Sequence, residues 1–289
     1  MRRLSKTRSI FLLLLALFVA GCQEKEDTPV KGSLKCYVDE SLYNVVKAER
    51  DTFMVLYPQT KIEIVSVKAR EGIAAVLNGE TRLFISSRNL NEEEQKYFKQ
   101  IKPDVRGFKF CYDAVVPIVK ERSSTDEITL EGIQALFSEP TPKFKLFVPE
   151  NNSGVYEYLK DRFGDKKDLK NVTLVKSEAE VIERVKSTNK GLGFVGLNSV
   201  EGVKGIKILE VGKTRSDGEA LYFKPYVAYL VSETYPLIRT TTILINDPGV
   251  GIASGFATFL TSYEGQKIVS KNNLGPATVP VKMVELNRR

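Results

Sequence analysis

Apolar and polar residues alternate along the chain with two periods, one typical of short strands and one typical of amphipathic helices. The predicted strands lie at 34–38, 62–67, 83–85, 108–112, 114–119, 146–148, 172–175, 191–196, 222–231 and 243–246. The predicted helices lie at 41–56, 72–77, 91–99, 126–137, 153–163, 179–186, 251–262 and 265–272. Strands that alternate with helices predict an α/β fold with largely parallel pairing. We expect two α/β lobes, with the chain crossing between them twice.

The first 21 residues have the pattern of an export signal. Basic residues stand near the start, an apolar run follows at 10–20, and the small residues Ala20 and Gly21 precede Cys22. An apolar run this short cannot cross a hydrocarbon core of about 30 Å as a helix, which needs roughly 20 residues. A cysteine directly after small residues resembles a bacterial lipobox, in which the thiol is acylated, for instance by palmitate. The alternative is an ordinary secretory signal with an incidental cysteine.

Cleavage before Cys22 would leave a protein that lies in the cell envelope, lipid-anchored to a membrane that faces the periplasm or the cell surface. Residues 22–32 are mostly polar and charged, so we expect a flexible tether there. The acidic cluster at 23–27 resembles the export tags that send some lipoproteins of Bacteroidetes-type bacteria to the cell surface. A charged tether alone would look the same.

Composition excludes several classes of function. Removing the signal leaves 268 residues and lowers the formal charge from +7 to +3, so the basic character argues poorly for a nucleic-acid partner. The chain has no histidine, which removes Ser–His–Asp and Cys–His nucleophile systems and histidine metal sites. No motif for a carboxylate, lysine or metal mechanism is visible. We therefore expect no enzymatic activity, no cofactor, no metal site and no nucleic-acid partner.

Two cysteines remain after lipidation. Cys36 and Cys111 both stand in apolar, strand-like runs, which favours two buried free thiols. Export permits a disulfide between them, but the sequence does not show whether their Cα atoms approach within bonding range.

The first candidate binding segment is Asp39-Glu40-Ser41-Leu42, where the first strand passes into its helix. Such junctions lie at the carboxyl ends of strands, where open α/β sheets bind ligands. The free N–H groups and the positive end of the helix dipole favour an anion there. In the alternative interpretation, Ser41 only caps the helix.

The second candidate segment is Ser86-Ser87-Arg88, which again follows a buried strand. The hydroxyls and the guanidinium form an edge rich in donors, and arginine can hold a carboxylate or a phosphate in a bidentate fork. The alternative is that Arg88 pairs with Glu92 or Glu93 of the following helix.

The third candidate segment is the turn at 150–156, which contains Asn152, Ser153, Gly154 and Val155 and opens a helix. The amide groups of such a turn can point at an anion. A plain loop with a helix N-cap would look similar.

Taken in order, these segments resemble the phosphate-binding proteins of bacterial ABC importers, a family of two-lobed periplasmic binding proteins. The segments that carry the resemblance lie at 39–41, 57–58, 83–88, 128–137, 152–154, 191–196, 251–266 and 274–280. The resemblance implies a type II-like fold in which each lobe is a mixed sheet flanked by helices. Lobe 1 would take residues 33–113 and 225–289, and lobe 2 residues 114–224. The ligand would sit in the cleft, held when hinge closure brings the lobes together.

The resemblance also implies which residues bind the ligand. They are Ser41, Leu42, Ser87 and Arg88 from lobe 1, and Asn152, Ser153, Gly154 and Val155 from lobe 2.

The chain departs from the family pattern in the second lobe. The family commonly has Ser-Gly-Thr with an arginine four residues before the serine, and here Val155 replaces the threonine and Pro149 the arginine. Losing one charge-assisted hydrogen bond to a buried anion costs roughly 1.5–3 kcal/mol. In lobe 1, Glu71 stands where well-known members have a serine. At the position of Arg88, some members of the family have an aspartate that accepts the proton of hydrogen phosphate.

Two functions follow from this pattern. The first is a lipid-anchored receptor that captures phosphate or a similar oxyanion and delivers it to an ABC permease, with Lys68, Arg70 or Arg88 compensating for the missing cation. The second is a lipoprotein of the same fold that acts in sensing or protein–protein contact and has a degraded anion site.

Overall fold

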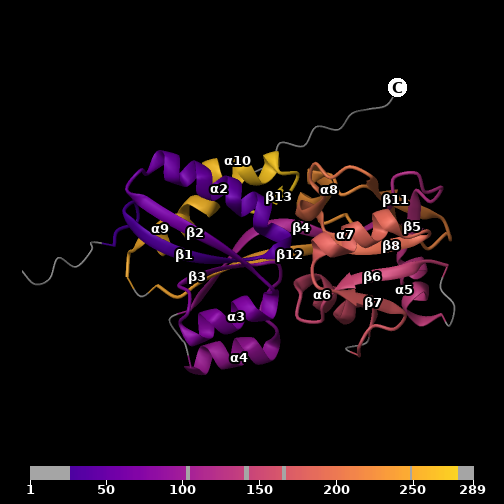
Figure 1. Ribbon diagram of the computed structural model, residues 1–289, viewed down its shortest axis with the longest axis horizontal. Helices are drawn as coiled ribbons and strands as arrows, with labels where there is room; N and C mark the ends of the chain where they lie inside the picture. The colour runs from indigo at the N-terminus through magenta and orange to yellow at the C-terminus, as the bar shows by residue number, and fades with distance from the viewer. Residues whose placement is uncertain (1–26, 102–104, 140–142, 165–166, 248, 279–289) are drawn as a thin grey trace, which may run out of the picture.

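The computed structural model describes residues 27–101, 105–139, 143–164, 167–247 and 249–278 (Figure 1). The predicted signal at 1–21 and the predicted lipidation site at Cys22 lie outside these residues. Within the described part of the chain, no helix combines the length and the apolar character that spanning a bilayer requires.

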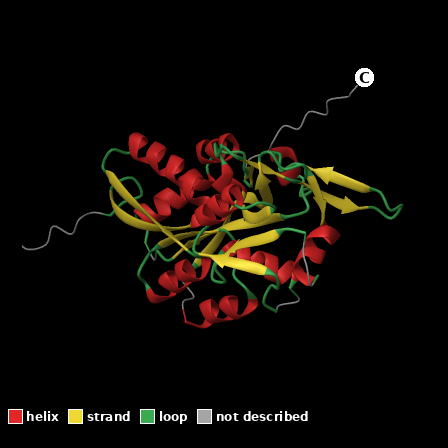
Figure 2. Ribbon diagram, turned by 45° about the vertical axis from the view of Figure 1, so that its right-hand side comes forward, coloured by secondary structure: helices red, strands yellow, loops and turns green. Residues whose placement is uncertain are grey.

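A mixed sheet runs through both halves of the molecule, with helices on either side (Figure 2). Its main path has the order β2-β1-β3-β12-β4-β8-β6-β7, and β9 and β13 pair with β4 beside this path. The strands of this sheet are β1 (Gly32–Asp39), β2 (Thr60–Val67), β3 (Leu83–Ser86), β4 (Arg106–Lys120), β6 (Lys145–Pro149), β7 (Val172–Val175), β8 (Gly191–Gly196), β9 (Ile206–Ile208), β12 (Ile238–Ile245) and β13 (Gly275–Pro276). A smaller sheet contains β5 (Glu127–Thr129), β10 (Glu210–Thr214) and β11 (Ala220–Phe223).

Helices cover both faces of the sheet in lobe 1, with α2, α9 and α10 on one side and α3 and α4 on the other (Figure 1). In lobe 2, α7 packs against β6 and β8. The helices are α2 (Tyr43–Leu56), α3 (Ala69–Asn78), α4 (Glu92–Ile101), α5 (Leu130–Ser138), α6 (Gly154–Phe163), α7 (Glu178–Ser187), α8 (Val227–Val231), α9 (Ile252–Thr261) and α10 (Tyr263–Lys271). Two 3₁₀ turns, η1 (Glu40–Leu42) and η2 (Leu197–Val200), follow β1 and β8.

Parallel pairing places the ends of three lobe 1 strands side by side. β1 pairs parallel with β2 and β3, and the apolar residues along these strands are mostly buried. Strands covered on both faces form continuous apolar runs, which is why they could be predicted. The carboxyl ends of β1 and β3 therefore point to the same edge, toward lobe 2.

Strand β4 connects the two lobes without a break. Residues up to Ala114 pair antiparallel with β12, and residues from Val115 onward pair antiparallel with β8. The prediction of two separate strands at 108–112 and 114–119 is therefore wrong, because the buried polar residue Asp113 interrupts the apolar pattern but not the strand. The exact lobe boundaries at 113/114 and 224/225 stay a prediction.

Two other predicted elements are corrected. The long strand expected at 222–231 ends at Phe223, because Pro225 follows, and the chain then forms the short helix α8. The helix expected at 126–137 begins only at Leu130, since Thr129 caps it by accepting a hydrogen bond from the Gly132 N–H at 3.0 Å.

The predicted flexible tether is shorter than 22–32. Asp27 accepts a hydrogen bond from the Ile252 N–H at 2.9 Å and pairs with Arg82, while Thr28 and Lys31 exchange backbone hydrogen bonds of 2.9 and 3.3 Å. Residues 27–31 are therefore fixed to lobe 1. Any free tether can extend no further than residue 26.

Both remaining cysteines are free thiols. Cys36 and Cys111 are fully buried, and burial raises the pKa of each thiol. The Cys111 Sγ lies 3.2 Å from the Thr241 hydroxyl, so it is held as a small core residue. The free-thiol interpretation is confirmed.

Candidate functional site

The predicted site residues meet where the carboxyl ends of β1 and β3 face the first turn of α6. Ser41, Leu42, Ser87, Ser153, Gly154 and Val155 are all buried, whereas Arg88 and Asn152 are partly exposed. Lobe 1 supplies its residues from the ends of two strands, β1 and β3. Lobe 2 supplies its residues from the start of one helix, α6.

Gly154 is a point of close approach between the lobes. A Cβ built on Gly154 would overlap the Ser87 Oγ and would lie 3.2 Å from the Asp39 Oδ2. Both of these oxygens are buried and have no hydrogen-bond partner among the described residues. Two polar atoms of lobe 1 therefore lie directly against the N-terminal turn of α6, where only a glycine fits.

Ser153 holds that turn in place. Its Oγ accepts a hydrogen bond from the Tyr156 N–H at 3.1 Å, which caps α6. Asn152 binds lobe 1, because its Nδ2 donates to the Glu71 Oε1 at 3.0 Å and its carbonyl accepts from the Arg70 N–H at 3.2 Å. The Val155 side chain is fully buried and belongs to the hydrophobic core.

Ser41 does not cap the helix that follows it, so that alternative is wrong. Asp39 caps the η1 turn by accepting from the Ser41 N–H at 3.0 Å, and α2 begins after Leu42 without a side-chain cap. The Ser41 hydroxyl instead donates to the Glu178 Oε1 of α7. The other Glu178 oxygen accepts from the Gly196 N–H at 2.7 Å. Glu178 therefore joins Ser41 of lobe 1 to the end of β8 in lobe 2.

An arginine that the sequence interpretation missed lies next to Ser41. Arg239 on β12 pairs in register with Asp113 on β4, and its Nε and Nη2 donate to one Asp113 oxygen at 2.9 and 2.6 Å. The Nη2 lies 2.7 Å from where a Gly196 Cβ would be, beside Ser41. The Arg239 Nη1 is buried and has no hydrogen-bond partner among the described residues.

The buried charges around Arg239 are predominantly negative. Burial raises the pKa of Asp39 to about 6, and nearby Glu178 adds to this effect, while Arg239 opposes it. Burial also raises the pKa of Asp113 against the opposing effect of Arg239. The centre therefore holds one buried arginine beside three buried carboxyl groups, which favours protonation of Asp39 in mildly acidic solution.

The expected cations of lobe 1 are already paired at the margin of the cleft. Arg88 donates to both Glu94 oxygens at 2.8 Å and also pairs with Glu157 of α6. The predicted partners Glu92 and Glu93 are wrong, because Asn91 and Glu94 bond each other at the start of α4 and this turns Glu94 toward Arg88.

Two further cations are held in the same way. Arg70 pairs with the other oxygen of Glu157, and Lys68 pairs with Glu40 at 2.6 Å. Glu40 is largely buried, and burial together with neighbouring Glu178 raises its pKa to about 7, although Lys68 opposes the shift. The two pairs with Glu157 cross between the lobes and stabilise the closed arrangement, whereas the Lys68–Glu40 pair lies within lobe 1 beside the junction.

Some of the missed residues left a signal in the sequence and others did not. Asp113 and Arg239 are charged residues inside apolar strand runs, which is a mark of a buried ion pair. Glu157 and Glu178 look like ordinary acidic residues of a first helical turn, so nothing distinguishes them before the fold is known.

The sequence profile described as "PBP superfamily domain" matches residues 23–264. Among curated proteins, the chain is 27% identical to the phosphate-binding protein PstS of Borreliella burgdorferi over 238 residues, which cover 73% of this chain and 78% of that protein. It is 23% identical to the phosphate-binding protein PstS of Pseudomonas aeruginosa over 286 residues, covering 89% and 86% of the two chains.

Solved structures give the same fold. A putative phosphate ABC transporter substrate-binding protein with bound phosphate from Clostridium perfringens matches with a TM-score of 0.73 and 18% identity, covering 85% of this chain and all of that one. An ABC-type phosphate transport receptor from Vibrio cholerae matches with a TM-score of 0.63 and 17% identity, with the same coverage. These matches confirm the resemblance and the two-lobed fold, and the chain belongs to the PBP superfamily.

Proposed function

We propose that this protein is a lipid-anchored solute-binding receptor that captures an inorganic oxyanion, with phosphate as the leading candidate, for an ABC importer. The observation that carries the proposal is the convergence of Asp39, Ser87 and the first turn of α6 at one buried point between the lobes, with Ser41 hydrogen-bonded to Asp39 beside it. The names of the relatives, which describe phosphate-binding and phosphate transport proteins, support the same ligand.

Three groups are available to an anion that enters while the lobes are apart. The Ser87 Oγ and the Arg239 Nη1 are buried donors without a hydrogen-bond partner among the described residues. The start of α6 lies against Ser87 and offers free N–H groups and the positive end of the helix dipole. Arg239 would thus supply the cation that is lost at Pro149, because its Nη1 has no hydrogen-bond partner among the described residues although its Nε and Nη2 pair with Asp113.

Binding at Ser41 requires Glu178 to release the hydroxyl. The carboxylate of lobe 2 and an incoming anion would compete for the same donor, so opening of the lobes frees Ser41 and the anion replaces the carboxylate. The activity of such a receptor is the difference in affinity between the open and closed forms. We propose that the protein catalyses no reaction.

A calorimetric titration of residues 23–289 with phosphate, sulfate and molybdate tests the proposal. We expect binding tighter than about 10 μM to one of these anions, which corresponds to roughly 7 kcal/mol. Ser87→Ala should weaken it by about ten- to a hundredfold, because a buried hydrogen bond to a charged group is lost. Ser270→Ala, an exposed serine on α10, should bind like the wild type.

The pKa of Asp39 predicts how the affinity of the site for phosphate differs from its affinity for sulfate. Asp39 faces the point where the anion would sit, and its raised pKa of about 6 means that it is mostly ionised at pH 7.5. Sulfate carries no proton near neutral pH, so its binding requires protonation of Asp39 and should strengthen as the pH falls toward 6. Hydrogen phosphate brings its own proton to the carboxylate.

Asp39→Asn therefore should bind sulfate about thirtyfold more tightly than the wild type at pH 7.5, which is the penalty for protonating a group 1.5 pH units above its pKa. The amide oxygen can still cap η1. Titrations at pH 5.5, 6.5 and 7.5 measure the effect. Sulfate affinity that does not change with pH in the wild type would contradict this role of Asp39.

A specific observation favours the second function, a lipoprotein in sensing or protein–protein contact. The donors Ser41, Arg70 and Arg88 are satisfied by carboxylates of lobe 2, so the closed form is stable without an external anion. Absence of both binding heat and a thermal shift with every anion tested would favour this function over transport.

The cell-envelope location and the acylation of Cys22 are part of the same proposal. The lipobox-like sequence supports them. The mass of the N-terminal peptide of the membrane-extracted protein tests them directly, since acylation adds the mass of the lipid to Cys22.

A further inference from the structure

An exposed apolar patch lies at the end of lobe 1 that faces away from the cleft. Val30, Leu56 and Val250 are 46%, 53% and 75% exposed, and they line one groove of about 470 Å³. Val55, next to Leu56 at the end of α2, is 78% exposed. Single exposed apolar residues are ordinary, but four of them from three distant segments at one end are typical of an interaction surface.

The topology fixes where this patch lies. β1 begins and α2 ends here, and β12 leads into the loop that carries Val250, whereas the carboxyl ends of β1 and β3 face the cleft. Figure 1 shows the described N-terminal end of the chain at the same end of the molecule, beside α9. The patch and the cleft are therefore at opposite ends of lobe 1.

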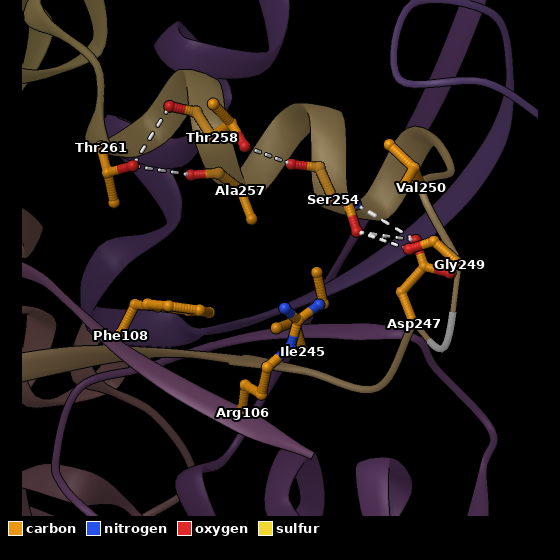
Figure 3. A pocket seen from close by; sticks show the side chains of 10 residues that line it. All are labelled: Arg106, Phe108, Ile245, Asp247, Gly249, Val250, Ser254, Ala257, Thr258 and Thr261. Atoms are coloured by element: carbon orange, nitrogen blue, oxygen red, sulfur yellow. Dashed lines mark hydrogen bonds between the residues drawn. The ribbon is translucent and has the colours of Figure 1, made fainter. Parts of the chain in front are cut away.

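The surrounding contacts make this end rigid. Asp247 accepts hydrogen bonds of 3.2 Å from the Ser254 N–H and hydroxyl, which holds the loop with Val250 against α9 (Figure 3). The Pro29 carbonyl lies so close to Gly255 that a Cβ there would overlap it. Val30 is thus fixed to α9, on the segment that leads back to the predicted anchor.

The short chain between Cys22 and Asp27 indicates that the membrane is the partner of this patch. Four residues separate Cys22 from Asp27, and a chain of that length spans at most about 17 Å when fully extended. A lipid on Cys22 would therefore keep Asp27 within that distance of the membrane surface, and the patch, which begins three residues later at Val30, would face a high effective concentration of bilayer. We propose that Val30, Val55, Leu56 and Val250 insert into the interface of the membrane that holds Cys22. This inference rests on the proposed lipid anchor.

The insertion sets the orientation of the receptor. With the free end of lobe 1 on the bilayer, the cleft lies beyond lobe 1 and opens into the aqueous phase. The solute can then reach the site while the protein is bound to the membrane.

The chain has no tryptophan, so single-tryptophan variants report on this surface without background. Val250→Trp is the probe, and Leu174→Trp, 45% exposed on β7 of lobe 2, is the matched control. Both lipidated proteins are placed in phosphatidylcholine vesicles with and without brominated phosphatidylcholine. We expect the fluorescence of Val250→Trp to shift to the blue and to fall at least twofold with brominated lipid, while that of Leu174→Trp stays unchanged.

Two outcomes would overturn the proposal. Equal fluorescence of Val250→Trp in both kinds of vesicle, in a chain whose N-terminal peptide carries the lipid mass, rejects the inserted patch and leaves the anchor intact. A blue shift that depends on protein concentration and persists without vesicles would mean that a second copy covers the patch. An N-terminal peptide without lipid rejects the anchor and the patch together, whereas the anion titration tests the receptor function separately.

Discussion

Replacing Gly154 by alanine is expected to weaken anion binding at least a hundredfold while both lobes stay folded. An alanine Cβ at this position would overlap the Ser87 Oγ across the cleft, so the lobes could not close as they do in the structure. Within α6 itself alanine is a favourable residue, so lobe 2 should not lose stability. Calorimetric titration gives the affinity, and small-angle X-ray scattering should show a larger radius of gyration than that of the wild type.

A second substitution shows whether the steric contact is the cause. Ser87→Gly in the Gly154→Ala protein removes the overlapping hydroxyl and should restore the compact form, with an affinity close to that of Ser87→Gly alone. Gly249→Ala is the matched control, because a Cβ there meets nothing within 4 Å. A Gly154→Ala protein that binds like the wild type would mean that the lobes need not approach this closely around the anion.

The fold could be predicted from the sequence where its pattern is local. β8 was predicted with its observed bounds because a buried strand forms a continuous apolar run, and the Tyr57-Pro58 pair marked the end of α2. Prediction failed where tertiary contacts override the local pattern. β12 begins five residues earlier than expected, because its polar first half, with Arg239, pairs with β4.

The candidate site could also be predicted only in part, because its contacts join residues that are distant in the sequence. Ser41 and Ser87 follow predicted strands, and Ser153 precedes a predicted helix, so general rules for α/β folds place them near one another. Their actual partners are far away in the sequence: Glu178 is 137 residues from Ser41, and Asp113 is 126 residues from Arg239. Such pairs depend on strand register and lobe closure, which a single sequence does not contain.

The cleft also explains how one fold serves either proposed function. Glu157 and Glu178 belong to lobe 2 and satisfy donors of lobe 1, so they stabilise the closed form by the same kind of contact that an anion would make. An anion must therefore bind more strongly than these carboxylates to shift the population. The unpartnered Arg239 Nη1 and Ser87 Oγ are the groups that can supply this difference.

The largest expected effect on stability comes from Glu49, which lies on α2 away from the cleft. Its side chain is fully buried, neither carboxyl oxygen has a hydrogen-bond partner among the described residues, and burial raises its pKa to about 9. The folded state thus binds a proton that the unfolded state, with a pKa near 4.5, releases. The contribution of Glu49 to the free energy of unfolding should therefore be highest below pH 4.5 and should fall as the pH rises toward 9.

Glu49→Gln should remove this dependence. Between pH 5 and pH 8 the wild type is expected to lose about 3–4 kcal/mol more stability than the variant, since each pH unit in this window changes the free energy by about 1.36 kcal/mol. Urea unfolding at both pH values measures the difference. Contributions of Asp39 and Glu40 are present in both proteins and cancel in the comparison. Glu63→Gln, at an exposed position on β2, is the control and should follow the wild type. Parallel pH profiles for wild type and Glu49→Gln would mean that Glu49 gains a partner or water in solution and is ionised there.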